Sequence, residues 1–206
     1  MTNAATVRVL GVCGSLQARS FNRSALDAVR AALPTGSATV DVYDGLRAIP
    51  PFDPDLGEAP GGAVDDWRAR IAAADVVLLA SPEYAGSLAG VLKNALDWVV
   101  GSGELYAKPV ALISVGTSGG VHARAALVRT LTWQGAHVVA SVGIEAPRTK
   151  SGPDGAFTDP ATLAMLRDLA ALVLRAPVME AAERRDRVHA VLADAGVGPD
   201  HLAPLD

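Results

Sequence analysis

Five hydrogen-bonding side chains lie within eight residues of one short segment of this chain. They supply two hydroxyls, two amides and a guanidinium, from Ser15, Gln17, Arg19, Ser20 and Asn22. The segment stands immediately before a predicted helix, whose first backbone N–H groups are unpaired and carry partial positive charge. A helix cap would need only one of these residues, Ser20. We therefore predict that the segment binds the phosphate of a ligand.

Two further segments combine polar groups with little steric bulk. Each directly follows an apolar run, and their candidate residues are Pro82, Glu83, Tyr84, Ala85, Ser118, Gly119 and Gly120. Glycine lets the backbone approach a flat ligand closely, and its N–H groups can point at that ligand. A carboxylate and an aromatic ring are available beside them. We predict that these two segments contact a planar polar ring.

The signatures of other nucleotide sites are missing from the sequence. Near the first predicted strand only Gly11 and Gly14 occur, so the Gly-x-Gly-x-x-Gly dinucleotide fingerprint is absent. The Gly-x-x-x-x-Gly-Lys-Ser/Thr motif of P-loop NTPases is absent too. The four histidines have no motif context, and no spacing of His, Cys and Asp predicts a metal site. A mononucleotide held by side-chain hydrogen bonds remains.

The elements that must position these segments alternate between strands and helices. Apolar runs predict five strands, at residues 7–13, 38–43, 75–80, 109–115 and 136–142. Amphipathic spacing predicts helices at residues 20–33, 63–74, 88–100, 121–134 and 160–175. This alternation indicates an α/β fold, with a doubly wound five-stranded parallel sheet and helices on both faces. Ligands bind outside the carboxyl ends of such strands, where all three segments fall.

Composition narrows the class of protein. The chain has 206 residues, 50% of them hydrophobic, a net charge of −4 and one cysteine, Cys13. This length suits one sizeable core, and we expect the lone cysteine to be buried in the first strand. A mildly acidic chain with no basic stripe argues against nucleic acid as a partner. The sequence shows no signal peptide and no membrane span, so we expect a cytoplasmic protein.

The last thirty residues differ in character from the rest. We predict one domain over residues 1–176, followed by a helical extension and a loose tail over residues 177–206. The extension begins with a charged segment, Glu180 to Arg187. A solvated surface helix is the simpler interpretation, and a helix that covers a neighbouring subunit is the alternative.

Two motifs give the chain a resemblance to a known family. In the first, Gly14-Ser15-Leu16 is followed by Ser20 and Asn22. The second fixes many identities at set spacing, as Pro82-Glu83-Tyr84-x-x-Ser87-x-x-Gly90-x-Leu92-Lys93-Asn94-Ala95-x-Asp97-Trp98. Over about residues 7–175 the chain resembles the NAD(P)H-dependent FMN reductase family. Its members have a flavodoxin-like fold and include quinone, chromate and azo-dye reductases.

The resemblance implies a cofactor, a reaction and an assembly. FMN would place its phosphate on Ser15, Ser20 and Asn22 and its ring on the Pro82-Glu83-Tyr84 segment, with Gly119-Gly120 nearby. NADPH or NADH would be the co-substrate, and a small molecule such as a quinone, chromate, an azo dye or free flavin the acceptor. No side chain need act catalytically, because the flavin N5 carries the chemistry. The family also implies a homodimer or homotetramer.

The chain departs from the family pattern at positions that bear on FMN affinity. Gln17 stands where Arg is usual, although Arg19 follows two residues later, and Ala85 stands where Asn is usual. Two other functions therefore remain as alternatives. One is an electron carrier of the flavodoxin kind, and the other is a non-catalytic module that has lost FMN.

Overall fold

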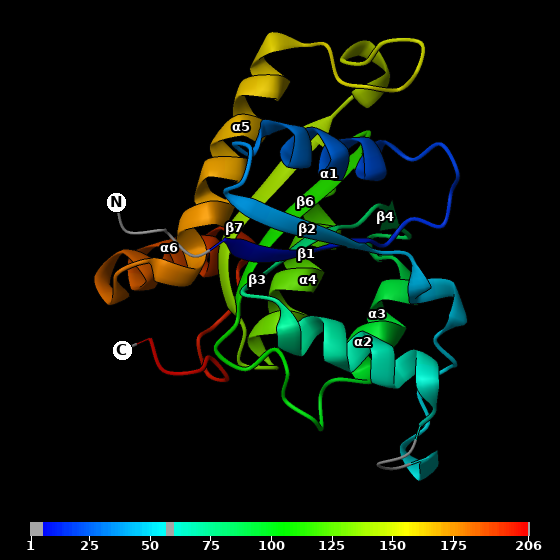
Figure 1. Ribbon diagram of the computed structural model, residues 1–206, viewed down its shortest axis with the longest axis vertical. Coiled ribbons are helices and arrows are strands. Elements are labelled where there is room, and N and C mark those ends of the chain that lie inside the picture. The colour runs from blue at the N-terminus through cyan, green and yellow to red at the C-terminus, as the bar shows by residue number, and fades with distance from the viewer. Residues whose placement is uncertain (1–5, 57–59, 206) are drawn as a thin grey trace.

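A single parallel sheet of five strands organises the molecule (Figure 1). The computed structural model describes residues 6–56 and 60–205. The strand order is β2-β1-β3-β6-β7. The strands are β1 (Val7–Cys13), β2 (Ala38–Tyr43), β3 (Val76–Ala80), β6 (Pro109–Gly116) and β7 (His137–Glu145). The predicted flavodoxin-like sheet is confirmed, because every neighbouring pair in it is parallel.

Helices cover both faces of the sheet, with α1 and α5 on one side and α2, α3 and α4 on the other (Figure 1). The six helices are α1 (Phe21–Ala32), α2 (Gly62–Ala73), α3 (Gly90–Asp97), α4 (Val121–Thr132), α5 (Pro160–Arg175) and α6 (Ala181–Ala195). Short 3-10 helices lie at Gly45–Ala48, Pro54–Leu56, Pro147–Thr149 and Ala176–Val178. The strand order reverses between β1 and β3, so their carboxyl ends open onto the crevice where ligands bind in such sheets.

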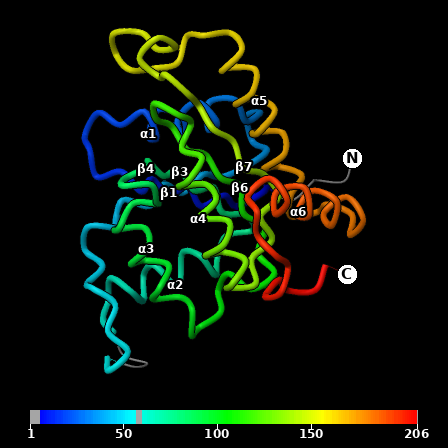
Figure 2. Tube along the Cα trace, turned by 180° about the vertical axis from the view of Figure 1, so that it is seen from behind, coloured from blue at the N-terminus to red at the C-terminus, as the bar shows by residue number. Residues whose placement is uncertain are grey.

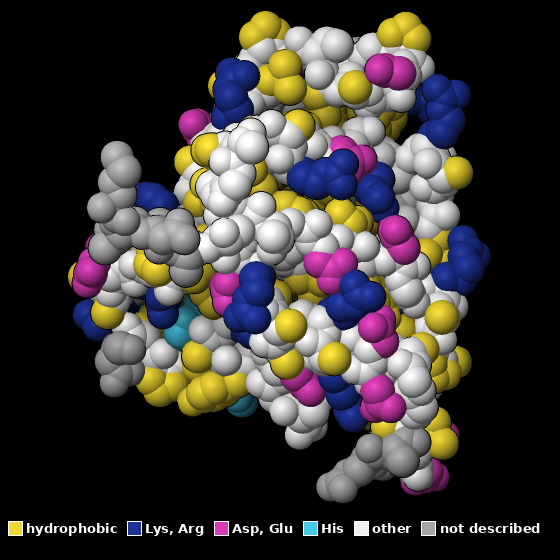
Figure 3. All heavy atoms as spheres, viewed as in Figure 1, with side chains coloured by type: hydrophobic (Ala, Val, Ile, Leu, Met, Phe, Trp, Pro, Cys, Tyr) yellow, Lys and Arg dark blue, Asp and Glu magenta, His cyan; other side chains and the backbone are white. Residues whose placement is uncertain are grey.

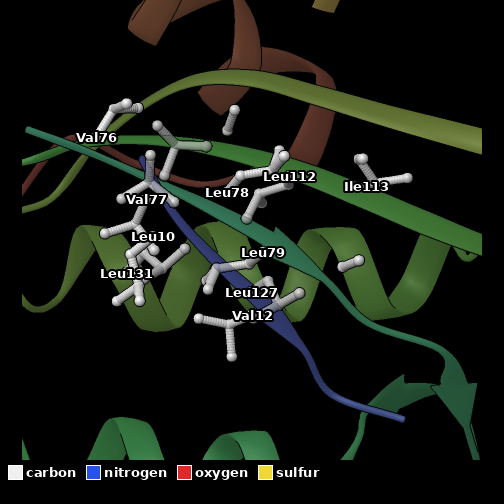
Figure 4. Close-up of a cluster of buried hydrophobic side chains, with 14 of the residues drawn as sticks. Leu10, Val12, Val76, Val77, Leu78, Leu79, Leu112, Ile113, Leu127 and Leu131 are labelled. Atoms are coloured by element: carbon white, nitrogen blue, oxygen red, sulfur yellow. The ribbon is translucent and has the colours of Figure 1, made fainter. Parts of the chain in front are cut away.

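The core forms where the central strands meet the helices. All five residues of β3 are buried, and so are the first seven of β6. Figure 4 shows Leu10, Leu79 and Leu112 from the strands packed toward Leu127 and Leu131 of α4. Strands covered on both faces must be apolar on both faces, which explains why the sequence shows continuous apolar runs here. Cys13 is buried at the end of β1, as predicted.

A small hairpin interrupts the path from β3 to α3, where the sequence predicted only a loop. Its strands are β4 (Glu83–Tyr84) and β5 (Ser87–Leu88), which pair antiparallel. The two linking residues, Ala85 and Gly86, both have positive φ, at 50° and 71°. This is the backbone of the tight turn whose twist suits a two-residue hairpin loop. Strands of two residues are too short to give a period, so sequence patterning missed them.

Helix α6 of the C-terminal extension packs onto the edge of the sheet. Helix α6 contacts the edge strand β7 and α4, and its Val188 and Leu192 are buried. Figure 2, a view from behind, shows α6 and the C-terminal segment beside that edge. In the segment that follows, Ala203 is buried and its carbonyl oxygen lies 3.3 Å from His137 Nε2. Only one face of α6 is solvated, because two apolar residues four apart share the other.

Charge is evenly mixed over the surface seen in Figure 3, where Lys and Arg side chains alternate with Asp and Glu. Among the surface ion pairs, Arg23 pairs with Asp44 at 2.8 Å, and Arg70 with Asp41 at 2.6 Å. None of the helices in the described part of the chain is long and apolar enough to cross a membrane.

The buried histidine makes stability depend on pH in a predictable direction. Burial lowers the pKa of His137 from its ordinary 6.5, and Arg184 lowers it further. Below pH 6.5 the unfolded chain therefore binds a proton that the folded chain resists. We expect the free energy of unfolding to fall on acidification from this group, by up to about 1.4 kcal/mol per pH unit.

Urea unfolding at about pH 7.5 and about pH 5.5 measures this effect. His137→Gln should lose part of the pH dependence, whereas His189→Gln, a change at an exposed histidine on α6, should keep it. Equal pH slopes for wild type and His137→Gln would show that His137 does not contribute.

Candidate functional site

One cleft of about 1130 Å³ opens at the carboxyl ends of the strands. All three predicted segments reach it, and nine of the predicted residues line it: Ser15, Gln17, Arg19, Ser20, Asn22, Pro82, Glu83, Tyr84 and Ser118. Ala85, Gly119 and Gly120 do not line it. The volume is at the upper end of the range for small-molecule and cofactor sites. The sequence therefore located the cleft, with three residues placed elsewhere.

The N-terminus of α1 faces the cleft without a capping side chain. Ser20 occupies the N-cap position, yet its hydroxyl makes no capping bond, and the first turn contains no acidic residue. The first helical bond runs from Ser24 N to Ser20 O, at 3.0 Å. The three preceding helical N–H groups have no acceptor in the described part of the chain. Unpaired donors at a positive helix end form an anion site.

Asn22 lines the cleft and also makes a contact within the protein that the sequence did not reveal. Its side-chain amide donates to Val115 O at 3.1 Å and accepts from Val115 N at 3.0 Å, and the residue is buried. These two bonds tie the start of α1 to the end of β6. Asn22 therefore holds two walls of the cleft together, with one donor and one acceptor of its side-chain amide.

The rest of the first segment is anchored at two points. Ser15 Oγ accepts from Gln17 N at 3.3 Å, which closes a local turn. Arg19 Nη2 donates to Pro153 O at 3.0 Å, which links the segment to the chain that follows β7. The side chains of Gln17 and Arg19 stay exposed at the rim. The charge that Arg19 brings is thus at the mouth of the cleft.

Glu83 caps the second helix that points at the cleft. Its Oε2 accepts from His122 N at 2.8 Å and from Ala123 N at 3.1 Å, at the start of α4. The N-cap of α4, Gly120, has no side chain to do this. A carboxylate at this position satisfies two unpaired donors and offsets the helix dipole. Of these two helix ends, α1 therefore remains the one available to an anion.

Two glycines shape the third segment from inside it. Gly119 and Gly120 are buried with φ of 67° and 61°. A Cβ on Gly120 would lie 1.8 Å from Ser114 Oγ, which itself donates to Ser81 O at 2.6 Å. Only glycine fits that position. The two residues were predicted to contact the ligand ring, but they form the turn that presents Gly116, Thr117 and Ser118 to the cleft.

A fourth wall of the cleft comes from the chain after β7. Ala146 to Thr149 and Gly152 to Gly155 line it, and they include the exposed guanidinium of Arg148. The sequence indicated no candidate residue in this stretch. The signal that could have found this wall is its place directly after the fifth strand, because that strand end opens on the same edge as the others.

The cleft offers mainly hydrogen-bonding groups to a ligand. In residues 6–56 and 60–205, no three His, Cys, Asp or Glu side chains gather in a way that could hold a metal ion. Burial raises the pKa of the Cys13 thiol, so that group stays protonated beside the first segment. The site is built to hold and orient a ligand.

Comparison with known proteins gives a consistent family. The family model described as NADPH-dependent FMN reductase matches residues 7–148. An NAD(P)H-dependent FMN reductase of Pseudomonas aeruginosa is 38% identical over 138 residues, which cover 64% of this chain and 72% of that protein. A probable NADPH:quinone oxidoreductase of Oryza sativa is 38% identical over 118 residues, covering 53% of this chain and 58% of its own length.

A solved structure supports the fold. The flavoenzyme NAD(P)H:(acceptor) oxidoreductase of Paracoccus denitrificans superposes with a TM-score of 0.69 at 24% identity, covering 84% of this chain and 98% of that one.

The hairpin turn next to the cleft gives a first prediction for this region. Ala85 holds a positive φ of 50° without the local hydrogen bonding that lets Asn adopt this conformation. Ala85→Asn should raise the free energy of unfolding by up to about 1 kcal/mol. The β-branched variant Ala85→Val should lower it, and thermal or urea unfolding compares the two. A destabilised Ala85→Asn would contradict the assigned turn.

The Glu83 cap gives a second prediction. Glu83→Ala leaves two N–H groups at the start of α4 without their acceptor. We expect a loss of about 1–2 kcal/mol in the free energy of unfolding, measured in urea. Glu83→Gln keeps an acceptor oxygen and should recover much of that loss. If Glu83→Ala is as stable as wild type, the cap does not contribute.

Proposed function

This chain belongs to the NADPH-dependent FMN reductase family, and from that premise we propose that it passes electrons from NAD(P)H through FMN in the cleft to a quinone-like acceptor. The family uses FMN with NAD(P)H as the electron donor, so the chain is an oxidoreductase. The proposal concerns where FMN is held and which class of acceptor follows. We assign this activity to residues 1–176, with residues 177–206 as a supporting extension.

The residues present fit the phosphate of FMN. The observation that carries the proposal is the contrast between two helix ends at one cleft, α4 capped by Glu83 and α1 left open. A phosphate at α1 would accept from backbone N–H groups and from the nearby hydroxyls of Ser15 and Ser20. Arg19 at the rim adds long-range attraction. Gln17 at the usual Arg position therefore need not abolish FMN binding.

The remaining walls suit a flat ring. The chemistry supplied by bound FMN is acceptance of a hydride and transfer of electrons to the second substrate. Pro82 and Glu83 line the cleft after β3, and Thr117 and Ser118 line it after β6. Tyr84 is 54% exposed at the rim, where its ring can flank an incoming aromatic molecule. The chain's own task is to bind, orient and leave one ring face accessible.

A quinone-like acceptor is the class that these observations favour. The exposed Tyr84 and the open cleft suit a planar aromatic substrate that docks and leaves. The relative from Oryza sativa is named as a quinone oxidoreductase.

We also propose that the chain assembles with itself, because the aromatic side chains of Tyr106 and Trp133 are 60% and 64% exposed. Light scattering would give the assembly state.

Steady-state kinetics test the proposed reaction. The FMN-loaded protein should oxidise NADPH or NADH continuously when a benzoquinone is added. Because both substrates would use one ring face in turn, double-reciprocal plots at several quinone concentrations should give parallel lines. No turnover of either nucleotide with quinones, azo dyes or free flavin would favour the electron-carrier alternative. A protein that binds no FMN would favour the non-catalytic module.

The phosphate assignment predicts how ligands are ranked. FMN should bind at least about tenfold more tightly than riboflavin, which lacks the phosphate. Ser20→Ala should lower the ratio of the riboflavin and FMN dissociation constants, because it should weaken FMN binding with little effect on riboflavin. It should cost little stability, since the hydroxyl makes no capping bond. Quenching of flavin fluorescence measures all four dissociation constants.

The matched control is Ser102→Ala, a serine whose hydroxyl donates to Glu104 at 2.6 Å, in a segment that does not line the cleft. It should leave the ratio unchanged. Equal affinity of wild type for FMN and riboflavin would place the phosphate outside the protein's contacts.

A further inference from the structure

Arg124 lies on the first turn of α4, and its side chain reaches back to the turn of residues 116–120. Gly116, Thr117 and Ser118 of that turn line the cleft. Its Nε donates to Gly119 O at 3.2 Å. Its Nη1 donates to Ser141 Oγ at 3.2 Å and to Ser141 O at 3.4 Å on β7. The side chain is only 17% exposed. A single guanidinium therefore joins the turn before α4 to the strand beside it.

The same turn is also packed tightly against Gly143 of β7. A Cβ on Gly143 would lie 2.5 Å from Gly119 O and 3.2 Å from Arg124 Nε. Ser118 also forms an isolated antiparallel bridge with Glu145. The carbonyl of Gly119 thus sits in a confined space, and Arg124 provides its hydrogen-bond donor. A buried carbonyl without a donor would cost free energy, which gives the contact a structural purpose.

We propose that Arg124 is a positioning residue that fixes the turn of residues 116–120, and through it the wall that Gly116, Thr117 and Ser118 present to FMN. The claim that Arg124 orders the turn stands on contacts alone. The claim that this order raises FMN affinity rests on the proposed function. Arg124 does not line the cleft, so it acts through the turn.

A second partner of Arg124 must be separated from these contacts. Asp194 of α6 lies with Oδ2 3.7 Å from Arg124 Nη1, and its side chain is 73% exposed. Exposed ion pairs contribute little, whereas hydrogen bonds from a charged donor to buried oxygens contribute more. We therefore assign the positioning effect to the oxygens of Gly119 and Ser141. On this assignment Asp194→Asn behaves almost as wild type.

Hydrogen exchange in the FMN-free protein tests the first claim. Arg124→Met should speed exchange of the amides in residues 116–120 by about tenfold or more, with the Pro82 to Leu88 hairpin unchanged. Gly143→Ala, which pushes on Gly119 O, should speed the same amides. Arg129→Met, the same substitution at an exposed arginine on α4, is the matched control. Unchanged exchange in both Arg124→Met and Gly143→Ala would overturn the proposal.

FMN titration tests the second claim. Arg124→Met should weaken FMN binding by about tenfold, and Arg124→Lys, which keeps the charge but not the fork of donors, should recover part of this. Asp194→Asn should change the affinity less than about twofold. A loss in Asp194→Asn as large as that in Arg124→Met would overturn the assignment. Normal affinity in a folded Arg124→Met whose turn exchanges fast would also overturn it.

Two outcomes are thereby kept distinct. If the wild type binds no FMN, the proposed function fails, while the exchange data still decide whether Arg124 orders the turn. If Arg124→Met does not fold, as thermal unfolding would show, Arg124→Lys and Gly143→Ala decide both claims in its place.

Discussion

The amide of Asn22 completes a sheet edge that β3 leaves open, and the cleft depends on it. In the register of the central strands Ala80 is opposite Ile113, so β3 ends while β6 continues to Gly116. Ser81 makes the last backbone contact, to Ile113 O at 3.0 Å, before Pro82 interrupts the strand. The N–H and C=O of Val115 then lack a strand partner on that side, and Asn22 supplies both bonds. A ligand site can open there without leaving buried backbone groups unpaired.

The N-termini of α1 and α4 differ in whether the protein itself satisfies their backbone N–H groups. Both α1 and α4 point their positive ends at the carboxyl edge of the sheet, as crossover helices do. Glu83 satisfies and neutralises one of them from 39 residues away in sequence, through bonds to His122 and Ala123. The other has no acidic residue in its first turn. The open end of α1 is next to the hydroxyls of the first segment, while Arg124 and Ser114 contact the turn that follows β6.

Sequence reasoning found the elements whose signals are local. Five apolar runs bounded by Pro, Gly and polar residues gave the strands, and the order of strands and helices gave the sheet. It placed the three segments at one edge because parallel strands end there. It did not find the bonds between Asn22 and Val115, because nothing near residue 22 reveals a partner 93 residues later. It assigned Gly119 and Gly120 to the ligand, because only the structure shows that Ser114 fills the side-chain space at Gly120 and that Glu145 crowds Gly119. The segment after α6 was predicted to be a loose tail, and no local pattern in it reveals that the carbonyl oxygen of Ala203 lies 3.3 Å from Nε2 of the buried His137.

The most direct test of the account is an anaerobic titration of the FMN-loaded protein with NADPH and with NADH, followed by the visible absorbance of the flavin. The account predicts that at least one nucleotide bleaches the flavin with a stoichiometry of about one hydride donor per bound FMN. Bound flavin that neither nucleotide reduces would contradict it, because the cleft would then hold the cofactor without admitting the donor.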